Sequence, residues 1–347
     1  MKKKRTGMMC AVFVLSLLLL AGCGRYGQGE TAQDTAPDGR PKVQVITTIF
    51  PPFDFVRRIG GDYVEVNMLL KPGMEAHSYE PTPRDIIRIT ESDLFLYAGG
   101  ESDVWVEELL KGNDAEVRSY SLLSWVDPLE EESLEGMQTR GHYHDGHDHE
   151  GRGEEFSAAL EAEQGTHLEE GEYDEHVWTS PANAILLVEK IKDTLISLDP
   201  ERAAVYEKNA GDYLEELEQL DADYREVTEQ AKRHTLVFGD RFPFLYLVRN
   251  YGLSYYAAFP GCSSETEPSA ATIAFLTDEV EEEQIPVVFR LELSNGKVAE
   301  AIAEVTGTET AMLHSCHTLT REEMERGETY LSLMRQNLVQ LDKALNG

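Results

Sequence analysis

The sequence predicts an α/β protein of two lobes, each a mostly parallel sheet with flanking helices, joined by one long backbone helix. Short apolar runs alternate with amphipathic stretches both before and after a single long helical pattern. This alternation is typical of parallel sheets that are covered by helices. The length of 347 residues suffices for one large or two medium domains.

Residues 1–22 are typical of an export signal. Basic residues 2–5 precede the apolar stretch Ala11–Leu20, which is too short to span a bilayer comfortably. The tetrapeptide that ends in Cys23 resembles a bacterial lipobox, in which this cysteine is diacylated; the alternative is an ordinary signal peptide with an incidental Cys23. Two acyl chains give stable anchoring. We therefore expect a lipid-anchored protein on the extracytoplasmic face of the cell membrane, with residues 23–41 as a flexible tether.

The expected N-terminal lobe covers residues 42–180. Its first strand is rich in β-branched residues and ends at Pro51-Pro52, and Thr82-Pro83 begins a capped helix. The expected strands are residues 43–49, 64–70 and 94–98, and the expected helices are residues 53–59 and 82–92.

An acidic insert at residues 127–175 interrupts this lobe. It has few apolar residues and only two basic ones, Arg140 and Arg152, so we expect it to be largely disordered. Histidines alternate with acids in it, which favours a secondary metal loop that collects or senses ions weakly; the alternative is a solvated charged loop. The histidines of this loop are His142, His144, His147 and His149.

Two linking helices are expected within residues 181–233. The first begins at Pro181, and the second runs from Pro200 to about Lys232, roughly 45–50 Å at 1.5 Å per residue. A narrow apolar stripe follows the second helix, which favours packing across two lobes over a coiled coil. The stripe consists of Tyr206, Ala210, Tyr213, Leu217, Leu220, Tyr224 and Val227.

The expected C-terminal lobe covers residues 234–347 and repeats the alternation. Ligands of open α/β sheets bind at the carboxyl ends of the strands, so two such lobes place a cleft between them. The expected strands are residues 235–238, 255–259, 286–290 and 310–313, and the expected helices are residues 243–251, 269–283, 298–306 and 329–345.

Charge and motifs exclude several classes of protein. The chain has 64 acidic and 31 basic residues and a formal charge of −33, which argues against nucleic-acid binding. It has no Walker A loop, G-x-S-x-G or H-E-x-x-H motif, so we expect no enzymatic activity. Four histidines remain on loops that follow strand-like segments, and imidazole is a natural zinc ligand. They are His77, His176, His314 and His317.

Three stretches carry a resemblance to a known family. Residues 46–51 (ITTIFP), 70–83 (LKPGMEAHSYEPTP) and 174–181 (DEHVWTSP) resemble the signatures of ZnuA-like solute-binding lipoproteins of zinc and manganese ABC importers. The resemblance implies a monomer that captures Zn²⁺ between its lobes and delivers it to an ABC permease with its cytoplasmic ATPase. Mn²⁺ or iron is the alternative cargo, and a surface metalloenzyme or adhesin on the same scaffold is the alternative function.

The resemblance implies that His77 and His176 are metal ligands. The third family ligand follows the long helix, where this sequence offers no histidine; Asp240 takes that place, or else pairs with Arg241 or caps a helix. The fourth lies beyond the last strand, where we favour His314 and leave His317 and Cys316 open.

Two further cysteines, Cys262 and Cys316, fall on expected loops of the C-terminal lobe that face the cleft. In an oxidising compartment a disulfide between them would close a long loop. The alternatives are two free thiols or a thiolate on the metal, and the sequence leaves these three states open.

Overall fold

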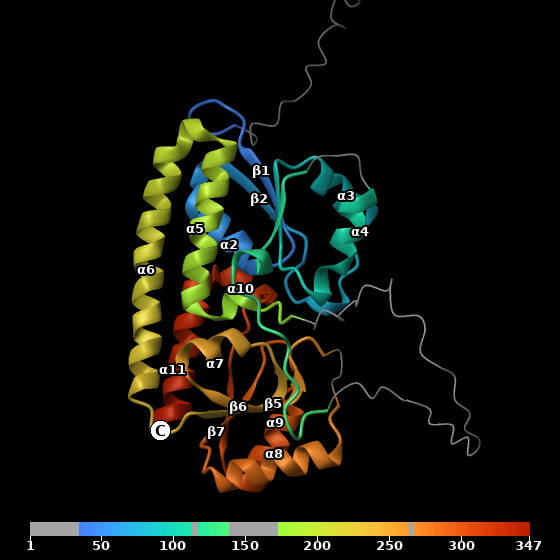
Figure 1. Cartoon of the computed structure of the whole chain (residues 1–347), viewed down its shortest axis with the longest axis vertical. Helices are drawn as coiled ribbons and strands as arrows, with labels where there is room; N and C mark the ends of the chain where they lie inside the picture. The colour runs from blue at the N-terminus through green and yellow to red at the C-terminus, as the bar shows by residue number, and fades with distance from the viewer. Residues whose placement is uncertain (1–34, 113–116, 139–172, 264–266) are drawn as a thin grey trace, which may run out of the picture. The chain divides into compact units, whose positions relative to one another are not determined.

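The computed structural model describes residues 35–112, 117–138, 173–263 and 267–347 (Figure 1). Residues 42–347 form one structural unit. The export signal, Cys23 and the four histidines of the secondary metal loop lie outside the described residues. Within the described ranges, no helix is long and apolar enough to cross a membrane.

The N-terminal lobe contains a four-stranded parallel sheet in the order β2-β1-β3-β4. The central strand β1 pairs Val45 with Val66 on one side and with Leu94 on the other. The apolar runs are therefore buried between neighbouring strands, as the sequence predicts. The strands are β1 Val43–Thr47, β2 Val64–Met68, β3 Leu94–Tyr97 and β4 Ser119–Ser121.

The C-terminal lobe repeats this topology in the order β6-β5-β7-β8, again all parallel. The register of β5 against β6 shifts between Phe238 and Arg241. Asp240 and Arg241 lie at this irregularity, near the carboxyl end of β5, and Arg241 lines the cleft described below. The strands are β5 Thr235–Phe242, β6 Ser254–Pro260, β7 Val287–Arg290 and β8 Glu309–Met312.

Helices cover both faces of both sheets (Figure 1). In the N-terminal lobe α2 and α5 lie on one face and α3 and α4 on the other, while α8 and α9 cover the outer face of the C-terminal sheet. The helices are α2 Phe50–Gly60, α3 Pro83–Thr90, α4 Val104–Gly112, α5 Pro181–Leu198, α6 Ala203–Glu229, α7 Leu245–Tyr251, α8 Ala270–Glu282, α9 Lys297–Thr306, α10 Arg321–Arg326 and α11 Tyr330–Asn346. Short 3₁₀ turns are η1 Gly61–Tyr63, η2 Ala76–Ser78, η3 Glu101–Asp103, η4 Leu123–Trp125, η5 Val177–Thr179 and η6 Pro200–Arg202.

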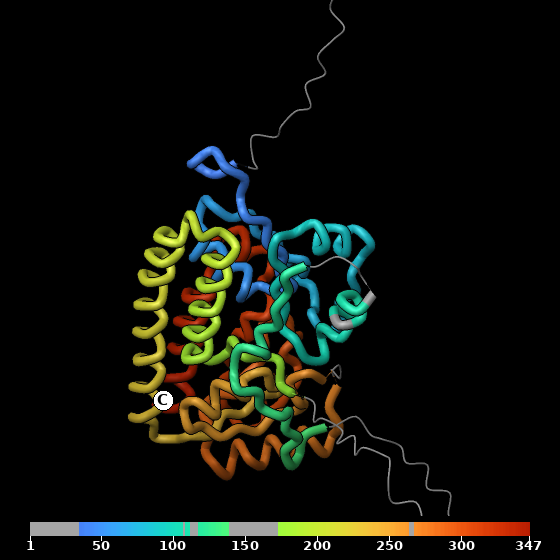
Figure 2. Tube along the Cα trace, turned by 45° about the horizontal axis from the view of Figure 1, so that its top comes forward, coloured from blue at the N-terminus to red at the C-terminus, as the bar shows by residue number. Residues whose placement is uncertain are grey.

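The long helix α6 joins the lobes, which confirms the predicted fold class. Its buried stripe packs against α2, α5 and α11, and Figure 2 shows these helices side by side. The Tyr224 hydroxyl donates a buried hydrogen bond of 2.8 Å to the carbonyl of Met334 on α11. One apolar core continues along α6 from Phe55 of the first lobe to Phe238 of the second.

Part of the acidic insert is ordered. Residues 127–138, here named the strap, pack against the C-terminal lobe. The Leu129 amide donates to the Tyr246 hydroxyl at 3.1 Å, and the Gln138 amide donates to the Ala258 carbonyl at 2.9 Å. Leu129, Leu134 and Met137 pack on the core. The prediction of disorder is therefore wrong for the strap. It rested on the composition of the whole insert, which is acidic on average although the strap contains these three apolar residues.

Several element boundaries differ from those expected. Helix α2 begins at Phe50, before the proline pair, because the first turn of a helix needs no intrahelical amide donor. The short elements α4, β4 and α10 are not among the predicted ones. Residues 35–41, placed in the expected tether, form a turn in which the Ala36 amide donates to the Arg40 carbonyl.

Two glycines give opposite predictions for stability. Gly211 lies inside α6, and a Cβ there would meet nothing within 4 Å. Gly211→Ala should stabilise the fold by about 0.5–1 kcal/mol. Gly239 lies in β5, where a Cβ would come within 2.5 Å of the Ala299 amide nitrogen. Gly239→Ala should destabilise by roughly 1–3 kcal/mol. Urea unfolding of both variants measures this, and equal effects would contradict the close approach of α9 to β5.

Candidate metal centre

His77 lies in η2, in the loop that follows β2. Gly73, with a φ of +80°, turns the chain here, and its amide donates to the Leu319 carbonyl at 2.7 Å. The loop of the first lobe is thereby bound to the loop after β8 in the second. His77 is placed at the carboxyl end of the first sheet, where the sequence predicts the cleft.

Glu175 and His176 lie in the buried segment that leads into α5. The Asp174 amide donates to the Leu129 carbonyl of the strap, and the Asp174 carbonyl accepts from the Tyr246 hydroxyl at 2.8 Å. The Trp178 indole donates to the Ser315 carbonyl, also at 2.8 Å. The segment is therefore held on both sides by the C-terminal lobe.

His317 reaches the same place because the loop after β8 turns sharply. Cys316 has a positive φ of 59°, which is uncommon for a residue with a side chain. The His317 amide donates to the Ser315 hydroxyl at 3.2 Å, and the His317 ring lies 4.9 Å from the Trp178 ring. The turn directs His317 and His314 to different places.

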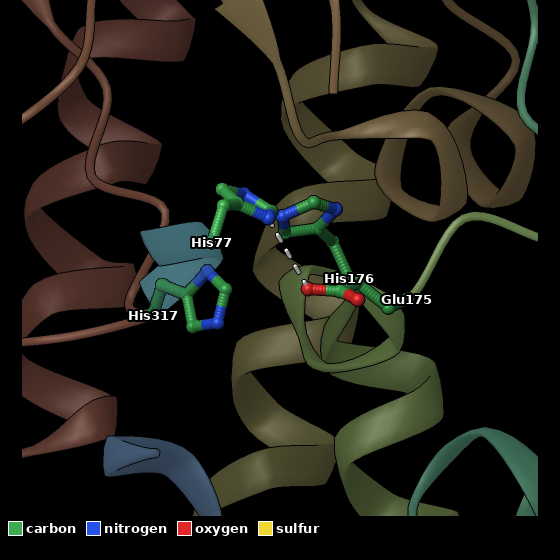
Figure 3. Close-up of side chains that lie close together, drawn as sticks. All are labelled: His77, Glu175, His176 and His317. Carbon is green, nitrogen blue, oxygen red and sulfur yellow. Dashed lines mark ion pairs between the residues drawn. The ribbon is translucent and has the colours of Figure 1, made fainter. Parts of the chain in front are cut away.

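His77, Glu175, His176 and His317 form one cluster (Figure 3). One nitrogen or oxygen from each lies within 4.8 Å of the corresponding atoms of the other three. The ring centroids are 5.6 Å apart for His77 and His176, 5.4 Å for His77 and His317, and 5.3 Å for His176 and His317. Loops of both lobes thus bring four potential metal ligands together.

Two of the imidazole rings make hydrogen bonds to residues outside the cluster. Nδ1 of His176 lies 3.1 Å from Oδ1 of Asp174, and Nδ1 of His77 lies 2.7 Å from the Ser102 hydroxyl. These contacts occupy Nδ1 of both rings, and Nδ1 of His77 also lies 3.7 Å from Oε1 of Glu175. Nε2 of His317 and Oε1 of Glu175 are buried and have no hydrogen-bond partner. Such orphaned atoms fit a bound cation, because buried polar groups otherwise find partners.

Electrostatics keep two of the imidazoles neutral. Burial, His176 and Arg241 together lower the pKa of His77 to about 3. Burial, His176, His77 and Arg241 lower the pKa of His317 well below its usual range. Burial opposes a charge on His176, but the Asp174 carboxylate outweighs it and raises the pKa of His176. Neutral imidazole is the form that binds metals.

An ion pair joins the lobes at the mouth of the cleft. The Arg241 guanidinium on β5 donates to both carboxylate oxygens of Glu75, at 3.3 and 2.9 Å. Both residues line a cleft together with His77, His176 and His317. The pair therefore lies between the cluster and the solvent.

The other candidate ligands lie outside the cluster. His314 is held by Asn337 through both its amide and its carbonyl at 2.7 Å, and its Nε2 lies 3.4 Å from Glu323. Asp240 accepts from the Arg241 and Leu291 amides at 2.9 and 3.3 Å. The geometry thus brings together His77, His176 and His317, whereas the sequence favoured His314.

The disulfide that the sequence left open is not formed. Cys262 and Cys316 are both free and buried. The Cys262 amide binds the Glu131 carboxylate of the strap at 2.7 Å, whereas Cys316 packs in the apolar core. The two thiols therefore belong to different environments.

Sequence reasoning missed Glu175 as a site residue. Its only signal was its position directly before His176 in the DEHVW motif. Its Oε2 accepts from the Ser102 amide at 2.9 Å, a contact between residues 73 positions apart that no local pattern shows. Burial raises the pKa of Glu175, so its ionised form is unfavourable here unless a cation lies nearby.

Comparison with known proteins identifies the family of this chain. The family model described as "ZnuA: Zinc-uptake complex component A periplasmic" matches residues 45–344. The zinc-binding lipoprotein AdcA of Streptococcus pneumoniae is 33% identical over 325 residues, which are 93% of this chain and 59% of that protein. The high-affinity zinc uptake system protein ZnuA of Bacillus subtilis is 30% identical over 349 residues and covers 99% of both chains. This chain thus spans less than two thirds of the pneumococcal relative.

Solved structures show the same fold. The Zn(II)-bound ZnuA-like domain of Streptococcus pneumoniae AdcA has a TM-score of 0.69 and 31% identity, and the match covers 88% of this chain and 100% of that one. The metal-dependent lipoprotein YcdH from Bacillus subtilis also has a TM-score of 0.69, with 28% identity and coverage of 88% and 99%.

A buried carboxylate behind the cluster gives a pH prediction. Burial and the neighbouring Glu175 raise the pKa of Asp103 to about 7, against about 3.9 in an unfolded chain. The folded protein holds this proton more tightly, so the contribution of Asp103 to stability is fully present below pH 3.9 and is lost as the pH rises through 7. Asp103→Asn removes this loss. In metal-free protein, the difference between its Tm and that of wild type should grow in its favour from pH 5 to about pH 7 and then level off.

The control for this prediction is Asp193→Asn, on the exposed surface of α5. A margin for Asp103→Asn that does not change with pH would contradict the raised pKa.

Proposed function

Since the chain belongs to the ZnuA family of zinc-uptake components, we propose that it captures Zn²⁺ outside the cytoplasm and delivers it to an ABC importer. The observation that carries the proposal is the cluster of three imidazoles and one carboxylate from both lobes. The names of the relatives describe zinc binding and uptake and no catalysis. Function here is the capture and release of an ion, with no bond chemistry.

The proposed ligands are Nε2 of His77, His176 and His317 together with Oε1 of Glu175. Three nitrogens and one oxygen match the four-coordinate tetrahedral sites that zinc prefers. A manganese site would be expected to contain more oxygen ligands. Four protein ligands also leave no position for a catalytic water, which separates this site from that of a zinc hydrolase.

Membrane attachment through Cys23 completes the proposal. The lipobox-like sequence before Cys23 supports a lipid anchor, and relatives carry the name zinc-binding lipoprotein. Anchoring would hold the protein next to an ABC permease and its cytoplasmic ATPase. The chain would work as a monomer, because one copy supplies all four ligands.

The two histidines of the loop after β8 give a direct test of the site. His317→Ala should lower zinc affinity by more than about 100-fold, beyond the 10–100-fold typical of changes around the ligands. His314→Ala should lower it by less than about 10-fold, because His314 binds Asn337 and Glu323. Competition with a chromophoric chelator measures both.

Glu175→Gln is the companion variant, since it keeps the shape of the side chain and removes its charge. It should weaken zinc binding more than His314→Ala does. A stronger effect of His314→Ala than of His317→Ala would overturn the ligand assignment, and unmeasurable zinc binding by wild type would overturn the proposed function.

The ion pair at the cleft mouth predicts the rate of release. Glu75→Gln and Arg241→Gln each break the pair but change the local charge in opposite directions. If the pair holds the cleft closed, both should speed zinc dissociation about fivefold, as expected for an interaction of about 1 kcal/mol. Stopped-flow transfer of zinc to excess chelator measures this rate.

Arg225→Gln is the matched control, because the Arg225 guanidinium also donates to both carboxylate oxygens of an acidic residue, Asp221 on α6. If Glu75→Gln and Arg241→Gln shift the rate in opposite directions, charge and not closure controls release.

A further inference from the structure

We propose that Ser102 is a positioning residue that holds two of the proposed zinc ligands, His77 and Glu175, in one arrangement. The inference rests on the proposed capture of zinc by the cluster and adds a determinant of its affinity. Ser102 lies in η3, the turn that follows β3. It does not itself belong to the cluster.

Two different groups of Ser102 contact the two ligands. Its hydroxyl lies 2.7 Å from Nδ1 of His77, and its amide donates to Oε2 of Glu175 at 2.9 Å. His77 and Glu175 come from separate segments, 25 and 73 positions away from Ser102. Ser102 is therefore hydrogen-bonded to both ligands, which lie far apart in the sequence, and holds their side chains next to each other.

The turn around Ser102 is shaped to receive Glu175. Gly99 and Gly100 have φ values of +87° and +80°, and a Cβ on Gly100 would come within 2.8 Å of Cβ of Glu175 and 2.9 Å of its Oε2. The Gly99 amide donates to the Asp103 carboxylate at 3.1 Å and closes the turn. Only a chain without a side chain at position 100 lets the Glu175 carboxylate approach the Ser102 amide this closely.

These contacts determine which atoms are left for the ion. The amide of Ser102 takes Oε2 of Glu175, and Oε1 remains buried without a hydrogen-bond partner, 3.7 Å from Nδ1 of His77. When Nδ1–H of His77 donates to the Ser102 hydroxyl, the lone pair of Nε2 is free for a metal. The partner of a ligating histidine sets its tautomer and orientation in this way.

The experiment compares wild type with Ser102→Ala, Ser102→Thr and Ser124→Ala. Ser124 is the matched control, since its hydroxyl donates only to the Ser121 carbonyl in a neighbouring 3₁₀ turn. Zinc affinity is measured by competition with a chromophoric chelator. In metal-free protein, two-bond ¹H–¹⁵N correlation spectra report the tautomer of His77.

Ser102→Ala should lower zinc affinity by about 10–100-fold, the range typical of residues that orient metal ligands, and should shift His77 from the Nδ1–H toward the Nε2–H tautomer. Ser102→Thr keeps the hydroxyl and should restore both readouts, while Ser124→Ala should change neither. Unchanged affinity or an unchanged tautomer in Ser102→Ala, or a threonine variant that behaves like alanine, would overturn the proposal.

The tautomer is read without zinc, so this test is separate from that of the proposed function. A wild type that binds no zinc would refute zinc capture, and the spectra of the metal-free variants would still decide whether Ser102 orients His77.

Discussion

The segment Asp174–Trp178 is the element on which the rest of the site depends, because it is hydrogen-bonded to several parts of the molecule at once. It binds the strap and Tyr246 through Asp174, the loop after β8 through Trp178, and the turn after β3 through Glu175. Burying this backbone is tolerable only because these partners satisfy its polar groups. The same contacts bring two ligands of one segment, Glu175 and His176, next to His77 of the first lobe and His317 of the second.

The metal-free cluster carries an unfavourable energy that an ion would remove. Oε1 of Glu175 and Nε2 of His317 are buried without hydrogen-bond partners, and an unsatisfied buried polar atom costs about 1–3 kcal/mol. A ligand that binds only the folded state stabilises it. A cation at this place would therefore stabilise the fold as well as fill the cleft.

The sequence predicted the sheets, the long helix and the positions of His77 and His176, since these depend on local periodicity and on contiguous motifs. It favoured His314 over His317, because the placement of the two side chains depends on the positive φ of Cys316 and on the hydrogen bonds of His314 with Asn337, which no sequence pattern shows. The sequence did not identify Glu175 as a site residue for the same reason, since its position depends on a contact with Ser102, which is distant in the sequence. Residues that are brought together by turns, or by contacts between distant parts of the chain, produce no periodic pattern in the sequence.

The apolar core that continues along α6 through both lobes has a mechanical consequence. Swinging the lobes widely apart would tear this core and expose it to water at roughly 25 cal/mol for each Å², and α6, 27 residues long, contains no proline at which to bend. The molecule is therefore expected to behave as a stiff frame. If the cluster binds an ion, we expect its exchange with solvent to require small displacements of the chain around Glu75, Arg241 and His317, and not a hinge between rigid halves.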